Sequence, residues 1–160
     1  RSDVMKVLDP REPNLKFPHS GTFSANPVTM TAGFVAMDLF DQEAVLKLNA
    51  LTNNAVSQIK EVIRLADVPV SVTGAGSMFR FHLTPTPPTT YREAYQTEET
   101  ISVVNELLDF LYFNEKILMV NTFSCMFSTV LTQKEVDRLS EGLLRAFNAL
   151  KPKIEKLHQK

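Results

Sequence analysis

Cysteine is almost absent from this sequence, since Cys125 is the only one among 160 residues. A lone cysteine excludes a disulfide within the chain and is typical of a reducing compartment. Long apolar runs are absent too, so no transmembrane helix is predicted, and no signal-peptide pattern is present. We therefore expect a cytoplasmic protein with no membrane partner.

Neither sign of charge is in excess. The sequence has 17 Lys and Arg against 18 Asp and Glu, a net charge of −1, and no basic stripe stands out. This balance argues against nucleic acid as a partner. The histidines at positions 19, 82 and 158 lack the spacing of metal ligands, so no metal site is predicted. A hydrophobic fraction of 44% indicates a globular protein with one core.

The order of predicted helices and strands indicates an α+β fold. Apolar residues at helical spacing predict helices at 26–39, 41–66, 97–114 and 132–150. Runs rich in β-branched and aromatic residues predict strands at 68–72, 77–83, 116–120 and 123–130. Because the strands fall in two hairpins between helices, we expect a small antiparallel sheet with helices packed on one face.

Three local patterns refine this fold. In the strand 77–83, alternation turns the aromatic residues toward the core and leaves Met78, Arg80 and His82 on the opposite face. Thr132 begins a capping box, and Pro152 is expected to kink or end the last helix. Cys125 lies in an apolar strand, where we expect it to be a small buried hydrophobe.

The segment at residues 19–33, HSGTFSANPVTMTAG, joins a loop of small hydroxyl residues to a helix start. Pro27 suits the first helical position, and Asn26 before it can cap the helix. Hydroxyl donors, a glycine and the positive end of a helix dipole would converge on one point, which favours a bound phosphate. On residue chemistry alone, an ordinary loop that caps a helix explains the same pattern.

The order of residues in this segment is more specific than the chemistry of the single side chains. The string GTFSANP at 21–27, followed by MTAG at 30–33, closely resembles G-T-x-S/N-x-N-P-x-x-M-A-A-G of class III aminotransferases. The nearest members of that family are the glutamate-1-semialdehyde aminomutases and the β-amino-acid transaminases. The string TGAGSMF at 73–79 also resembles the C-terminal domain of the family.

The resemblance implies a cofactor and a partner. In that family, the threonine of this loop reaches across a dimer interface to the phosphate of pyridoxal 5'-phosphate. Gly21 and Thr22 are therefore the implied cofactor-binding residues, and a second copy of the protein is the implied partner. The implied reaction is the transfer of an amino group between an amino acid and a keto acid or aldehyde, so the other partners are small molecules.

The resemblance also implies how the chain is divided and what it lacks. In fold type I, residues 1–40 would be a remnant of the large cofactor-binding domain, and residues 41–160 the small C-terminal α+β domain. The family's Schiff-base lysine precedes a glycine-rich loop, and no lysine here has that setting, so no catalytic residue is assigned. That lysine is expected upstream of Arg1, and the chain alone is expected to be inactive. The alternative is a non-catalytic dimerisation or interaction module with the same fold.

Neither substrate signature of the resembled family is present. Its β-amino-acid transaminases carry a carboxylate-binding arginine at a position that matches about Thr122, and its aminomutases carry a glutamate near Ser124. The nearest arginine on a predicted strand is Arg80. Its guanidinium could bind a substrate carboxylate through two hydrogen bonds, or it could form a surface ion pair.

Overall fold

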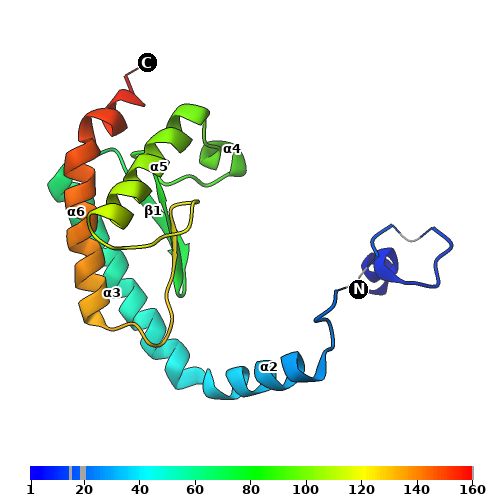
Figure 1. Ribbon diagram of the computed structural model, residues 1–160. Helices are drawn as coiled ribbons and strands as arrows, with labels where there is room; N and C mark the ends of the chain where they lie inside the picture. The colour runs from blue at the N-terminus through cyan, green and yellow to red at the C-terminus, as the bar shows by residue number, and fades with distance from the viewer. Residues whose placement is uncertain (15, 19–20, 160) are drawn as a thin grey trace. The chain divides into compact units, whose positions relative to one another are not determined.

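The computed structural model describes residues 1–14, 16–18 and 21–159. The chain divides into two compact units, Arg1–Asp41 and Gln42–Lys160. The first unit contains the helices α1 (Ser2–Met5) and α2 (Pro27–Leu39) and a 3-10 turn, η1 (Lys6–Leu8) (Figure 1). Between η1 and α2, the described residues form neither helix nor strand, as the prolines there predict.

The second unit has the predicted α+β fold. Its helices are α3 (Gln42–Ala66), the single turn α4 (Tyr91–Ala94), α5 (Glu98–Phe113) and α6 (Gln133–Lys156). Its strands are β1 (Ser71–Ala75), β2 (Met78–His82) and β3 (Ser124–Met126), which form one antiparallel sheet with β2 in the middle. The long helices α3, α5 and α6 run together beside this sheet (Figure 1). No helix in the described part of the chain is both long and apolar enough to cross a membrane.

The aromatic side of β2 meets the helices, as the alternation of its residues predicts. Phe79, Phe81 and Leu83 are all buried. Phe81 stacks on Phe123 with 4.6 Å between ring centroids and meets Phe147 of α6 edge to face. The helices add Ile59, Leu107 and Leu143 to the same core. Burial of these large side chains is the main stabilising contribution to the unit.

Capping residues set where the helices begin. Thr132 accepts a hydrogen bond from the Lys134 amide at 3.3 Å, and the Glu135 carboxylate accepts one from the Thr132 amide at 2.8 Å. This reciprocal pair is the predicted capping box at the start of α6. Thr97 caps α5 by the same chemistry, since its hydroxyl accepts from the Thr100 amide.

Pro152 lies inside α6, which continues to Lys156, so the predicted helix end at Pro152 is wrong. Proline has no N–H to bond to the carbonyl of Asn148, and this loss destabilises a helix interior by about 3 kcal/mol. Asn148 is on the exposed side of α6, where water can bond to its carbonyl oxygen. Ile154 is fully buried in the core. Burying an isoleucine stabilises by about 1.5–3 kcal/mol, which helps to hold the last turn in place.

The predicted strand at 116–120 does not form. Only an isolated bridge joins Val120 to Ser124, and Lys116 and Phe123 both have left-handed backbone angles, with φ of 56° and 55°. Such angles interrupt an extended strand. The Ile117 amide instead bonds to the Leu111 carbonyl and folds the segment back onto the end of α5. The neighbouring predicted strand at 123–130 shrinks to the three residues of β3.

Two smaller differences concern the first hairpin and α4. The first strand was predicted at 68–72 but lies at 71–75, because Val68 and Val70 are buried without joining the sheet. The α4 turn lies between the predicted elements, where the sequence predicts neither helix nor strand. Thr90 caps it by accepting from the Glu93 amide, a local contact within one turn.

Candidate functional site

The loop that resembles the aminotransferase cofactor loop is described from Gly21 onward, and His19 and Ser20 lie outside the described residues. Gly21 accepts a backbone hydrogen bond from Ser24 at 3.0 Å, which closes a tight turn. A Cβ at Gly21 would lie 2.8 Å from the Ser24 hydroxyl oxygen, so a larger residue there would displace that hydroxyl. Ala25 completes the turn with a left-handed backbone, φ 56°.

The N-terminus of α2 has the predicted cap but no spare amide. Asn26 accepts from the amides of Val28 at 3.0 Å and Thr29 at 3.4 Å, and Pro27 has no N–H. The Met30 amide bonds to the Asn26 carbonyl at 2.9 Å. All donors of the first turn are therefore used within the chain, so the helix end offers a phosphate its dipole but no free amide.

Thr22 keeps its hydroxyl available. The side chain is exposed, and no hydrogen bond to it is found among the described residues. A hydroxyl is a neutral donor that can bond to a phosphate oxygen. The loop therefore fits a phosphate through the side chain of Thr22 rather than through the amides of α2.

Arg80 lies in the second unit, at the middle of the central strand β2. Its neighbours across the ladder are Thr73 on β1 and Ser124 on β3. The side chain is partly buried, and its Nε has neither solvent contact nor a hydrogen-bond partner within the described chain. No carboxylate of the described residues forms an ion pair with it. The alternative of a surface ion pair is therefore wrong for Arg80 within this part of the chain.

His82 shares the face of Arg80 and is buried. Residues after α4, among them Tyr95 and Thr97, line a cavity of about 200 Å³ over it. His82 Nε2 lies 2.7 Å from the Thr73 hydroxyl oxygen. Burial lowers the pKa of His82, and the positive charge of Arg80 lowers this pKa further.

Cys125 on β3 behaves as the predicted small hydrophobe. It packs against the core, and burial raises the pKa of its thiol to about 12. A thiol with this pKa is a poor nucleophile at neutral pH. In the described ranges, no group of three His, Cys, Asp or Glu residues could hold a metal ion.

Parts of known aminotransferases and aminomutases are similar to this chain in sequence. The chain is 32% identical to an uncharacterized aminotransferase of Schizosaccharomyces pombe over 141 residues, which cover 86% of this chain and 30% of that protein. It is 40% identical to the glutamate-1-semialdehyde 2,1-aminomutase of Chlamydia felis over 81 residues, which cover 50% of this chain and 18% of the relative. No protein-family model matches the chain.

Solved structures agree in fold and sequence. An omega-transaminase from Sphaerobacter thermophilus matches with a TM-score of 0.75 and 32% identity, covering 92% of this chain and 33% of the other. The chain is therefore similar to a part of these aminotransferases in both sequence and fold. A β-phenylalanine aminotransferase from Variovorax paradoxus matches with a TM-score of 0.73 and 25% identity, covering 94% and 34% of the two chains. A third transaminase, at 22% identity and a TM-score of 0.69, shares the fold.

The chain spans about a third of the length of the relatives that it matches. Of the residues singled out by sequence, Gly21 and Thr22 lie together in the first unit and Arg80 lies in the second. Sequence reasoning missed the setting of Arg80 between Thr73 and Ser124. Alternation alone places residues on a face of a sheet, whereas the register between strands decides which of them are neighbours.

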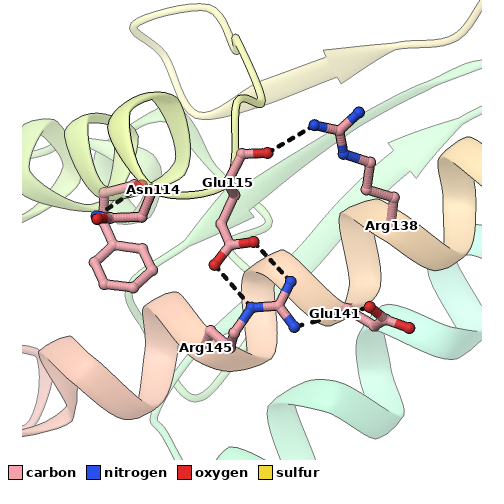
Figure 2. Close-up of polar contacts among 6 residues, drawn as sticks. Asn114, Glu115, Arg138, Glu141 and Arg145 are labelled. Carbon is pink, nitrogen blue, oxygen red and sulfur yellow. Dashed lines mark hydrogen bonds and ion pairs between the residues drawn. The ribbon is translucent and has the colours of Figure 1, made fainter.

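A second polar cluster, in the second unit, is structural. Glu115, just after α5, accepts two hydrogen bonds from the guanidinium of Arg145 on α6 (Figure 2). Arg138 donates to the Glu115 carbonyl at 2.9 Å. Gly142 permits this approach, since a Cβ there would lie 2.9 Å from Ile117. The cluster therefore anchors the end of α5 to α6 and has no unpaired group left for chemistry.

Proposed function

We propose that this chain is the C-terminal part of a class III aminotransferase or aminomutase that depends on pyridoxal 5'-phosphate. The observation that carries the proposal is the continuous match to aminotransferases, over 86% of the chain in sequence and 92% in structure. The reaction is the transfer of an amino group between an amino acid and a keto acid or aldehyde. A solved transaminase of the same fold has pyridoxal phosphate bound, which supports the choice of cofactor.

The two units have different roles in this proposal. Residues 1–40 are a remnant of the large cofactor-binding domain, and residues 41–160 form the small α+β domain. Thr22 donates its hydroxyl hydrogen to a phosphate oxygen. Gly21 has no side chain, so the tight turn next to Thr22 can form. When bound, the cofactor supplies an electron sink for the amino-acid carbon that loses a proton.

In our proposal, the lysine that anchors the cofactor lies in a part of the protein outside this chain. The chain by itself is then inactive. The ten lysines of this chain cannot substitute by number alone, because the reaction needs one lysine placed at the cofactor's reactive carbon. On the helices, Lys47 and Lys153 are already paired with Glu43 and Glu106, which supports a role in surface ion pairs.

We further propose that the complete enzyme is a cytoplasmic homodimer with no nucleic-acid partner. The apolar surface of α2 supports the dimer, because this helix buries none of its residues within the chain. Several of its large apolar side chains are exposed, namely Val28, Met30, Phe34, Met37 and Leu39. A helix that is apolar all round is normally covered by protein in the assembled molecule.

The test begins with the coding sequence upstream of Arg1. We expect a lysine followed by a glycine-rich loop, and a complete protein that binds pyridoxal phosphate and transfers amino groups. The 160-residue chain, given the same cofactor, is expected to show neither property. A natural start codon near Arg1, together with no cofactor binding by the product, would favour the non-catalytic interaction module instead.

A further inference from the structure

Arg80 has a property that the reaction proposed above does not use. Its Nε is buried and has no hydrogen-bond acceptor within the described chain, although the side chain as a whole is only partly buried. A buried donor without an acceptor is costly, and native structures normally supply one. Solvent does not reach Nε itself, but the side chain is partly exposed and forms no ion pair with the described residues, so an acceptor from outside can bind the exposed part of the guanidinium.

The neighbours of Arg80 add a second donor. Ser124 lies directly opposite it on β3, and side chains paired in this way have Cβ atoms about 5 Å apart. The Thr122 hydroxyl donates to the Ser124 oxygen at 3.1 Å, so the hydrogen of Ser124 remains to be donated. On the other side, Thr73 is occupied by its contact with His82. The group that completes the site is thus an acceptor, bonded by Arg80 and Ser124 together.

The sheet face that carries Arg80 has basic but no acidic residues on its strands. The face carries no acidic residue, since its members besides Arg80 are Ser71, Thr73, Ala75, Met78, His82, Ser124 and Met126. Met78 and Met126 pair beside Arg80 and are 58% and 62% exposed, whereas His82 and Ser71 are buried on its other side. An anion can therefore approach the guanidinium over the two methionines, where no carboxylate of the strands repels it. Glu93 and Glu99 line the cavity at His82, on the other side of Arg80.

We propose that Arg80, assisted by Ser124, binds the carboxylate of the amino-acid substrate. This inference rests on the function proposed above. A guanidinium presents a planar fork of donors that matches the two oxygens of a carboxylate, which a lysine cannot do. The same chemistry would accept a carboxylate from another part of the complete protein, and the experiments below separate the two sources.

The first experiment measures binding without turnover. The ¹⁵N-labelled chain is titrated with propionate, and with propylammonium as the matched ligand that lacks the carboxylate. We expect propionate, and not propylammonium, to shift the Arg80 Nε–H resonance saturably. Propionate also raises the pKa of His82, because it offsets the positive charge that lowers this pKa.

Matched arginine variants control this titration. Arg80→Gln is expected to abolish the response of His82 to propionate. Arg92→Gln, which removes an exposed arginine from α4, is expected to retain it. An Arg80 resonance that does not move, or a His82 response that survives in Arg80→Gln, would overturn the proposal. Neither readout needs amino transfer, so this test is decided even where the proposed function fails.

The second experiment identifies the source of the carboxylate in the complete protein. The substrates are 3-amino-3-phenylpropanoate and 1-phenylethylamine, which differ by the carboxylate alone. We expect Arg80→Gln to lower the ratio of their kcat/KM values by about 10- to 100-fold, the effect of losing a hydrogen-bonded charge. Arg92→Gln leaves the ratio at its wild-type value. An unchanged ratio in Arg80→Gln would mean that Arg80 meets a carboxylate of the protein, and would overturn substrate binding.

Discussion

Glu115 and Arg145 form a two-bond ion pair that ties the segment after α5 to the middle of α6. The Nε–Oε1 distance is 2.7 Å and the Nη2–Oε2 distance is 2.6 Å, and only 13% of the Glu115 side chain is exposed. The two residues are 30 positions apart in the sequence. Such parallel hydrogen bonds are the strongest form of carboxylate–guanidinium contact.

This pair predicts a pH dependence of stability. The hydrogen bonds from Arg145 lower the pKa of Glu115 from its ordinary value of 4.5. A carboxyl whose folded pKa is depressed stabilises the fold above its unfolded pKa, and this contribution is lost as pH falls through the folded pKa. We expect Glu115→Gln to lower the thermal midpoint at pH 7, with the difference from wild type shrinking below pH 4.5. A difference that stays constant from pH 7 to pH 3 would contradict this assignment.

The second prediction concerns the packing of α6. Leu143 is fully buried between the sheet and the other helices. Leu143→Ala is expected to destabilise the protein by roughly 2–5 kcal/mol, through lost burial and the cavity left behind. Leu65→Ala on α3 is the matched control, because Leu65 is 58% exposed. Chemical denaturation measures both, and equal midpoints for the two variants would contradict the core assignment.

The third prediction concerns Pro152. Pro152→Ala restores the N–H that can bond to the Asn148 carbonyl inside α6. We expect the variant to be more stable by about 1–3 kcal/mol, since proline in a helix interior costs about 3 kcal/mol relative to alanine. Amide hydrogen exchange should show stronger protection in residues 152–156. A variant less stable than wild type would mean that the proline ring packs usefully.

The fourth prediction concerns Cys125. Because burial raises the pKa of its thiol to about 12, the thiolate is scarce at pH 7 and the sulfur is hard to reach. Iodoacetamide is expected to leave the native protein unmodified and to label it stoichiometrically after denaturation. Intact mass measures both states. Rapid labelling of the native protein would show that β3 opens readily.

The fifth prediction concerns Thr22 in the complete enzyme. Thr22→Val keeps the shape of the side chain and removes the donor, so affinity for pyridoxal phosphate is expected to fall about ten- to a hundredfold. Thr22→Ser keeps the donor and is expected to have a much smaller effect. Fluorescence titration of the apoenzyme with cofactor compares them. Equal behaviour of the two variants would leave Thr22 as a loop residue with a structural role.

A heterodimer tests which subunit Thr22 serves. One subunit carries Thr22→Val, and one subunit lacks the cofactor lysine, so a single functional site remains. We expect that site to be impaired when the variant threonine lies on the lysine-less chain. The site is expected to be normal when the variant threonine lies on the chain that carries the lysine. The opposite pattern would place the threonine in its own subunit's site.

Much of the fold follows from local sequence. Period-two alternation identifies the buried side of β2, and Phe79 and Phe81 are buried accordingly. The pairing of Thr132 with Glu135 marks the start of α6, and Asn26 with Pro27 marks the start of α2. These signals work because each depends on groups that lie within one turn of a helix or along one strand.

The remaining features depend on contacts between distant residues. The end of α6 depends in part on burial of Ile154, which offsets much of the local effect of Pro152. The short β3 was decided by left-handed turns at Lys116 and Phe123, which local propensity does not reveal. The first amides of α2 are bonded to Asn26, so the helix end has no free amide there for a phosphate.

The candidate carboxylate site shows the same division. The sequence by itself determined that Arg80 lies on a strand, away from the aromatic side, and that Gly21 and Thr22 belong to an aminotransferase-like loop. Only the tertiary structure decided that Arg80 has no acid partner in the described chain and lies opposite Ser124. The physical reason is that strand register and burial are set by the whole sheet and its covering segments, whereas alternation is set by the backbone of one strand.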